Sequence, residues 1–213
     1  MKEIEIKKVL ESKNLIIHHQ KRERMVMYDD LHYYKIWVPN WEHSQVLRNA
    51  FEIGFYDKNT TPAFSKIITE NGLDRGYIMY RGTVAGNSND NWNKLINQTS
   101  HEQRLSFIKN LFQKAVNTNC IPSDMSPSNI ILYNGKISLI DLEGFQSFEW
   151  LFHGKPQQWE AQNRNLKKAP NPFWRDMSKN ILSFLDQCVG LKYNKKLDRL
   201  ENIIEINNKL EDF

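Results

Sequence analysis

The feature that most constrains the fold of this chain is a pair of short β-rich runs joined by Asn134-Gly135. The runs cover residues 130–133 and 136–140, and Asn-Gly between such runs is the strongest short sequence signal for a two-residue hairpin turn. This turn fixes the register of the two strands, so Asn129 before the hairpin and Asp141 after it emerge side by side at its open end. The segment therefore predicts an amide and a carboxylate held together.

Two further residues complete a longer pattern around this hairpin. Asp124 stands five residues before Asn129, and Gly144 follows Asp141 by three. The order DxxxxN, hairpin, Asp and Gly resembles the catalytic segment of the protein-kinase-like superfamily. The resemblance implies that Asp124 orients and deprotonates an acceptor hydroxyl, that Asn129 binds magnesium, and that Asp141 chelates magnesium bridging the nucleotide phosphates. The ending LIDLEG is closer to choline kinases and antibiotic or sugar phosphotransferases than to the DFG of protein kinases.

The pattern also departs from the family, and it has a simpler alternative. Pro122 stands where the family usually carries His, and Ser123 stands where protein kinases usually carry Arg. No GxGxxG occurs between the first predicted strands, and the absence of GxxxxGK excludes a Walker-type nucleotide site. The alternative is a surface hairpin whose flanking Asp and Asn residues only cap turns, because both types hydrogen-bond to nearby backbone.

The amino-terminal part of the chain is strand-like. Three β-branched or aromatic runs, separated by charged turns, cover residues 14–19, 24–28 and 32–38. In the third run, alternation predicts Tyr34 and Ile36 on one face of a sheet and Lys35 on the other. The resemblance implies that Lys35 holds the α and β phosphates of a nucleotide. An exposed sheet lysine is the alternative.

Apolar residues at helical spacing predict a helix over residues 41–53. The resemblance implies that a carboxylate of this helix pairs with Lys35, and Glu52 lies near the expected spacing. Glu42 is the competitor, but it follows Lys35 too closely to reach back from a helix face. Either glutamate could instead be an ordinary solvated residue.

The remaining elements divide the chain into two predicted lobes. Further strands are expected at 62–68 and 77–80 with Gly72 and Gly76 bounding their turn, and the small polar run 82–88 reads as a hinge. Beyond it, a helix over 102–116 begins at a capping Ser100. A later helix, 173–185, carries Asp176, which the resemblance places beneath the catalytic loop as support. A first-turn helix Asp favoured by the dipole is the alternative.

Composition limits the functional classes. The 213 residues carry a formal net charge of +4 without a basic tail, which gives no reason to expect a nucleic-acid partner. No run of eighteen apolar residues predicts a membrane span, and only two cysteines occur, outside any metal-spaced cluster. We therefore expect a cytoplasmic protein, with no prediction of its oligomeric state.

Together these features predict an α+β protein with a two-lobed protein-kinase-like fold. Residues 1–82 would form a lobe with a small antiparallel β-sheet and one helix, and residues 83–213 a mainly helical lobe with the catalytic loop. The expected activity transfers the γ-phosphoryl group of ATP, with Mg2+, to a hydroxyl of a small molecule or glycan. The alternatives are a pseudokinase that binds nucleotide or serves as a scaffold, and a minimal Ser/Thr protein kinase.

Overall fold

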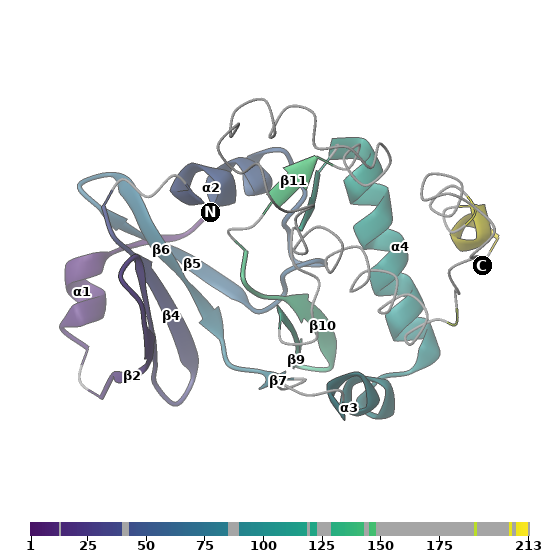
Figure 1. The fold of residues 1–213 in the computed structure, drawn as a ribbon, viewed down its shortest axis with the longest axis horizontal. Helices are drawn as coiled ribbons and strands as arrows, with labels where there is room; N and C mark the ends of the chain where they lie inside the picture. The colour runs from purple at the N-terminus through teal and green to yellow at the C-terminus, as the bar shows by residue number, and fades with distance from the viewer. Residues whose placement is uncertain are drawn as a thin grey trace, which may run out of the picture. The chain divides into compact units, whose positions relative to one another are not determined.

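The computed structural model describes residues 1–12, 14–39, 43–84, 90–118, 120–122, 129–142, 145–147, 190, 205 and 208–212. Helices and strands both contribute to this part of the chain, so the predicted α+β class is confirmed (Figure 1). The chain divides into two compact units, the first made of Met1–Val84 and Ile131–Gly144 and the second of Ala85–Ile130 and Phe145–Phe213. Residues 131–139 of the hairpin belong to the first of these units, and the predicted lobe boundaries stay a prediction.

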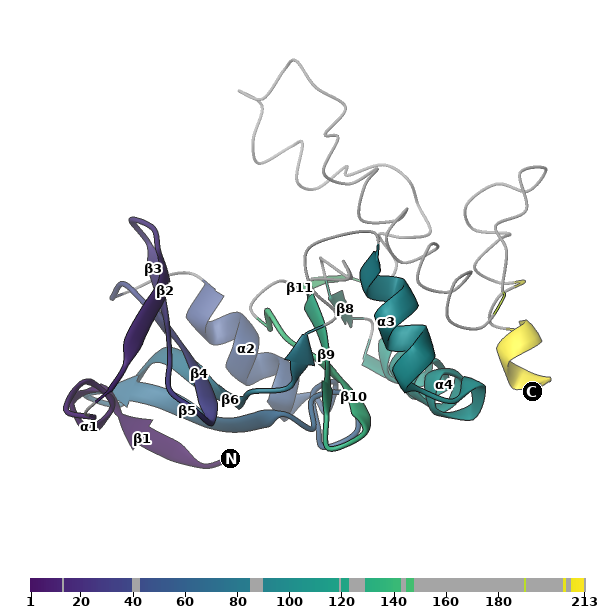
Figure 2. The same cartoon turned by 90° about the horizontal axis from the view of Figure 1, so that it is seen from below.

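A six-stranded sheet dominates the first unit, in the order β1-β5-β6-β4-β3-β2 (Figure 2). Its strands are β1 (Glu3–Glu5), β2 (Ile16–Gln20), β3 (Arg24–Tyr28), β4 (His32–Trp37), β5 (Phe64–Glu70) and β6 (Leu73–Tyr80). All neighbouring strands are antiparallel except β1, which runs parallel to β5. The five strands predicted from the sequence are confirmed, whereas β1 and the helix α1 (Ile6–Leu10) were not predicted.

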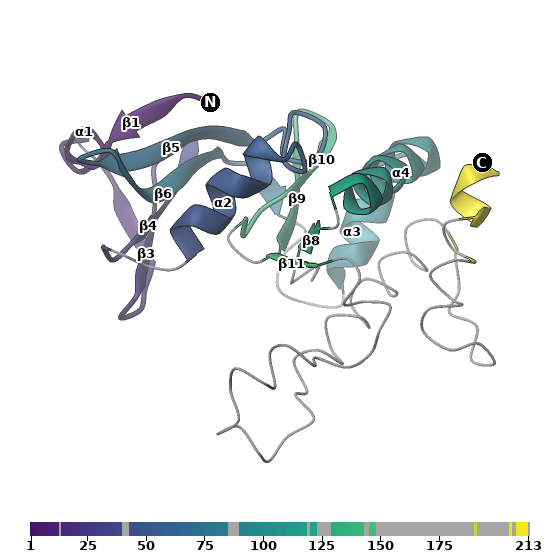
Figure 3. The same cartoon turned by 90° about the horizontal axis from the view of Figure 1, so that it is seen from above.

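The two faces of this sheet differ in the way that the alternation predicts. Tyr34 and Ile36 belong to a buried apolar cluster, together with Ile6 and Val9 of α1. Lys35 therefore lies on the opposite face, with Trp37 two residues further along β4. Helix α2 (His43–Glu52) lies alongside β6 (Figure 3) and buries Leu47 and Ala50, which confirms the predicted helix.

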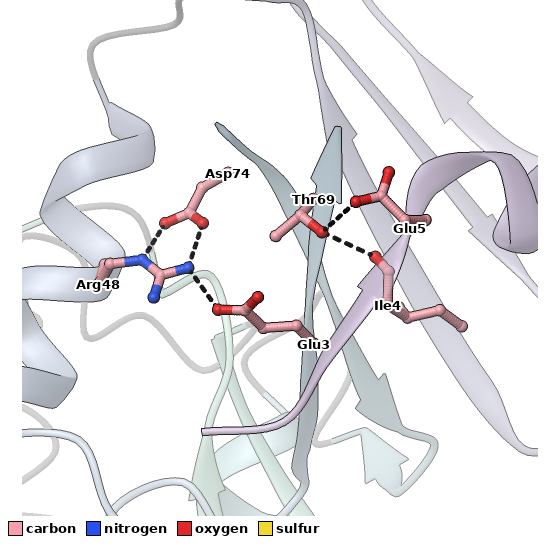
Figure 4. A network of polar contacts seen from close by, with 6 residues as sticks. All are labelled: Glu3, Ile4, Glu5, Arg48, Thr69 and Asp74. Atoms are coloured by element: carbon pink, nitrogen blue, oxygen red, sulfur yellow. Dashed lines mark hydrogen bonds and ion pairs between the residues drawn. The ribbon is translucent and has the colours of Figure 1, made fainter. Parts of the chain in front are cut away.

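Arg48 of α2 fastens this helix to the sheet. Its guanidinium donates two hydrogen bonds to Asp74 of β6, from Nε to Oδ2 at 2.9 Å and from Nη2 to Oδ1 at 2.6 Å. Nη2 also reaches Glu3 of β1, at 2.9 Å from Oε1 (Figure 4). Asp74 raises the pKa of Arg48 above its ordinary value, against the opposing effect of partial burial and with further help from Glu3. Thr69 adds hydrogen bonds to the carbonyl of Ile4 and the carboxylate of Glu5 in the same region.

The predicted hairpin is confirmed. Strands β9 (Ile130–Tyr133) and β10 (Lys136–Leu139) flank Asn134 and Gly135, whose φ angles of 48° and 72° are both positive, as a type I′ turn requires. Strand β7 (Thr83–Val84) pairs with β9 and completes a three-stranded sheet in the order β10-β9-β7.

In the second unit, helix α4 (His101–Thr118) confirms the predicted helix and its cap. The Ser100 hydroxyl accepts a hydrogen bond from the Gln103 N–H at 3.1 Å, and the Gln103 side chain accepts one from the Ser100 N–H at 2.8 Å. This reciprocal pair is a capping box. Helix α3 (Asp90–Gln98) precedes it and was not predicted, and the short strands β8 (Cys120–Pro122) and β11 (Phe145–Ser147) pair antiparallel.

Parts of the predicted arrangement fall outside the described residues. These are hinge residues 85–88 and the helix over 173–185. Near the carboxyl end, residues 205 and 208–211 are helical, and Leu210 is buried. None of the helices that the structure describes combines the length and the apolar character needed to cross a bilayer.

Candidate active site

Lys35 and Asp141 form an ion pair between Nζ and Oδ1, although 106 residues separate them in the sequence. Lys35 extends from the middle of β4, and Asp141 follows the end of β10. The Lys35 side chain is 12% exposed and the Asp141 side chain 34%, so the lysine is largely buried and solvent can reach the carboxylate. Both residues belong to the first unit, so the structure brings together two of the predicted site residues.

The backbone at Asp141 adopts an uncommon conformation. Its φ angle is 61°, in the left-handed region that L-residues other than Asn and Asp rarely enter. A residue held in such a conformation needs surrounding contacts to keep it there, and such residues cluster at functional sites. The strand β10 thus ends in a turn that directs a carboxylate toward Lys35.

The segment just before Asp141 is tied to the loop between α2 and β5. The Leu139 N–H donates to the carbonyl of Thr60 at 3.0 Å, and the Ala63 N–H donates to the hydroxyl of Ser138 at 3.2 Å. Thr60, Ala63 and Ser138 are fully buried, so these hydrogen bonds are shielded from water. These hydrogen bonds therefore fix the end of the hairpin, two residues before Asp141, to the loop between α2 and β5.

Gly76 allows the neighbouring strand to approach Lys35 closely. It lies inside β6 opposite Ile36, and a Cβ atom built on it would stand 1.9 Å from the Lys35 carbonyl oxygen. Its φ of 150° is a conformation that residues other than glycine rarely adopt. The sequence analysis placed Gly76 at the end of a turn, and this was wrong, because Asn71 and Gly72 alone make that turn with positive φ angles.

Glu52 does not contact Lys35 among the described contacts. It is the last residue of α2, and its side chain is exposed. The helix buries Ala50, and a position two residues later is rotated by roughly 200° about the axis, away from the sheet. Among the described residues, the carboxylate of Asp141 forms an ion pair with Lys35, and the sequence analysis treated Asp141 only as a metal ligand.

The sequence analysis named four further residues. Asn129 immediately precedes β9, is buried, and belongs to the second unit. Asp124 and Asp176 lie outside the described residues, as does the competitor Glu42. The roles of these residues stay predictions. Within the described ranges, no three His, Cys, Asp or Glu side chains gather into a set that could hold a metal ion by themselves.

An aromatic cluster that the sequence analysis did not identify lies on the Lys35 face of the sheet. Tyr33 precedes Lys35 by two residues, so the two side chains share that face, and its ring centroid lies 5.9 Å from that of Tyr28 on β3. The Arg81 guanidinium lies over both rings, 5.0 Å from the Tyr28 centroid and 5.4 Å from that of Tyr33. His18 meets both rings edge-on at 6.1 Å.

Comparison with known proteins gives structural matches only. No family model matches the chain, and no curated protein matches its sequence. The ADP-bound aminoglycoside phosphotransferase APH(2'')-Ib is 14% identical over 96% of this chain and 94% of that chain, with a TM-score of 0.45. WbdD is 13% identical over 92% of this chain, with a TM-score of 0.43, and only 50% of WbdD is covered. The streptomycin-ATP-APH(2")-IIa ternary complex is 11% identical over 88% and 94% of the two chains, with a TM-score of 0.45.

Proposed function

We propose that this protein is an ATP- and Mg2+-dependent phosphotransferase that moves the γ-phosphoryl group of ATP to a hydroxyl of a small molecule or glycan. The observation on which the proposal rests is the ion pair of Lys35 with Asp141 at the end of the Asn-Gly hairpin. Phosphoryl transfer depends mainly on positioning and on neutralising phosphate charge, and a lysine beside a magnesium-binding carboxylate serves both needs.

Four of the predicted residues act directly in this proposal. Lys35 neutralises the phosphates, and Asp141 and Asn129 would hold Mg2+, for which their oxygen atoms are suitable hard ligands. The partial exposure of the Asp141 carboxylate supports this fit, because a ligand must be reachable by a cation from solvent. Bound Mg2+ supplies positive charge between the phosphates. Asp124 positions the acceptor hydroxyl and receives its proton.

The proposed location is the cytoplasm, where ATP is available and thiols stay reduced. The two cysteines of the chain, Cys120 and Cys188, support this because so few cysteines suit a reducing compartment. Asp176 keeps its predicted supporting role beneath the catalytic loop, whereas Glu52, exposed at the end of α2, is given no role beside Lys35 in this proposal. The acceptor class is proposed from the LIDLEG ending rather than from any described contact.

The test combines nucleotide binding with transfer. Thermal unfolding is measured with ATP, with and without Mg2+, and γ-labelled ATP is then offered with aminoglycosides, sugars, lipid headgroups or a generic protein. At a hundredfold excess over Kd, bound nucleotide should stabilise the fold by about 2.7 kcal/mol. Asp141→Asn should lose this stabilisation, and the exposed Asp30→Asn serves as the matched control. Asp124→Asn should keep the stabilisation and slow transfer by roughly 100-fold or more.

A second candidate is a nucleotide-binding module that transfers nothing. It is favoured by the turn between β2 and β3, where the Lys21 N–H donates to the Arg24 carbonyl at 2.8 Å and three charged residues, Lys21, Arg22 and Glu23, stand in place of a glycine-rich loop. Stabilisation by Mg-ATP without labelled product from any acceptor would favour this module. Label on the generic protein alone would favour the minimal protein kinase. The absence of both nucleotide stabilisation and phosphoryl transfer would refute the proposed function.

A further inference from the structure

Two tyrosine hydroxyls hold the backbone of Leu142, the residue that follows Asp141. The Leu142 N–H donates a hydrogen bond to the Tyr77 hydroxyl oxygen at 3.1 Å, across 65 residues of sequence. The Tyr56 hydroxyl donates to the Leu142 carbonyl, also at 3.1 Å, across 86 residues. Leu142, Tyr77 and Tyr56 are 0%, 3% and 2% exposed, so both hydrogen bonds are sealed from water.

These hydrogen bonds have a direct effect on the conformation of Asp141. The Leu142 N–H belongs to the peptide group that joins the two residues, so anchoring it fixes the orientation of the backbone leaving Asp141. On the other side, the Leu139 N–H is anchored on Thr60. A buried backbone group that loses its partner is costly, which makes both phenols strong restraints. Asp141, with its φ of 61°, is therefore held from both directions.

Tyr77 also supports the other member of the ion pair. On β6 it lies directly opposite Lys35 of β4, so the two side chains share one face of the sheet. Its ring packs edge-on against Trp37 with 5.8 Å between centroids, which keeps the phenol from turning away. The Tyr77 side chain thus packs against the strand that carries Lys35 and hydrogen-bonds to the backbone next to Asp141.

We infer that Tyr77 and Tyr56 are positioning residues that set the Asp141 carboxylate for the divalent cation of a bound nucleotide. This inference rests on the proposed function, since it concerns the same metal site. Neither phenol touches the cation in this scheme, and each acts through the Leu142 backbone. Groups that orient a metal ligand commonly change metal affinity by 10- to 100-fold when removed. Because these tyrosines hold the backbone rather than the carboxylate itself, we expect about a tenfold effect from each.

The test compares Tyr77→Phe and Tyr56→Phe with Tyr133→Phe. Each change removes one hydroxyl and keeps the ring, and Tyr133 lies in the first unit, where its ring stacks on Tyr80 with 5.1 Å between centroids. The main measurement is the Mg2+ concentration that gives half of the ATP-dependent thermal stabilisation. It should rise about tenfold in the first two variants and stay within twofold of wild type in the control.

A second measurement separates positioning from simple loss of stability. Amide hydrogen exchange at Leu142 should accelerate in Tyr77→Phe, whose hydroxyl accepts that N–H, and much less in Tyr56→Phe. Ser100→Ala, which weakens the cap of α4, supplies a destabilised protein with an intact site and should keep its Mg2+ response.

The outcomes are distinct. A wild type that responds to Mg-ATP, with unchanged Mg2+ half-saturation in both tyrosine variants, would overturn the inference and leave the proposed function standing. An equal rise in Ser100→Ala would also overturn it, because the effect would then follow stability alone. A wild type without any Mg2+-dependent nucleotide response would overturn both.

Discussion

Replacing Gly76 with alanine should destabilise the first unit more than the same change at Gly72, in the turn between β5 and β6. The new Cβ would lie 1.9 Å from the Lys35 carbonyl oxygen and 2.9 Å from the carbonyl carbon. Both are backbone atoms of β4, so no side chain can turn aside to make room. Relief requires the two strands to separate at the position that carries Lys35.

The expected cost has two parts. Forcing alanine into a conformation at φ 150° that it rarely adopts costs roughly 1–3 kcal/mol, and overpacking against backbone adds roughly 1–3 kcal/mol. We therefore expect the free energy of unfolding to fall by about 4 kcal/mol. In a chain of this size that lowers Tm by roughly 8–16 °C.

Gly72→Ala is the matched control. Gly72 also has a positive φ, of 78°, but nothing lies within 4 Å of its added Cβ. Only the conformational cost of about 1–2 kcal/mol applies there. Urea unfolding followed by circular dichroism measures both variants. Equal destabilisation of the two would refute the reasoning, because it would mean that β4 and β6 separate at Lys35 without appreciable cost.

Other predictions concern the remaining polar contacts. Arg48→Ala should lower the free energy of unfolding by about 1–2 kcal/mol, because it leaves the largely buried Asp74 carboxylate without its two-pronged partner, and urea unfolding measures the loss. Ser100→Ala should cost about 1 kcal/mol through the cap of α4, and a change below a few tenths would contradict the capping box. Burial alone would raise the pKa of Asp29, but hydrogen bonds from Tyr34 and from two backbone amides lower it. The Asp29 contribution to stability should therefore be present above about pH 4 and disappear as the pH falls through the lowered pKa. Burial and the same contact raise the pKa of Tyr34, so its contribution should be lost as the pH rises beyond about 10. Unfolding titrations of wild type and Tyr34→Phe test both limits, and identical pH profiles would contradict them.

The sequence predicted the elements whose structure is determined by residues close together in the chain. The hairpin follows from Asn134-Gly135 and its flanking β-rich runs, and α4 follows from its apolar spacing and its capping serine. The direction of Lys35 follows from strand alternation. In each case the residues that determine the structure are within a few positions of one another.

The missed features depend on contacts between distant parts of the chain. Strand β1 has only three residues, too few for the alternation of Glu3, Ile4 and Glu5 to indicate a strand, and its partner β5 lies about 60 residues further along the chain. The Tyr56 and Tyr77 hydroxyls meet Leu142 through the fold alone. For the candidate site, the sequence identified Lys35 and Asp141 separately but did not predict their ion pair, because neither position encodes the distance to the other.

The division of the chain into units has a consequence for dissecting the protein. The first unit is assembled from two separate stretches of sequence, with residues 85–130 lying between them. A fragment that stopped at Val84 would lack Ser138 and Leu139, and would leave the buried amide of Ala63 and the carbonyl of Thr60 without these partners. A peptide spanning the hairpin could restore these partners in trans, whereas truncation after Val84 alone would leave both buried backbone groups unpaired and the fragment destabilised.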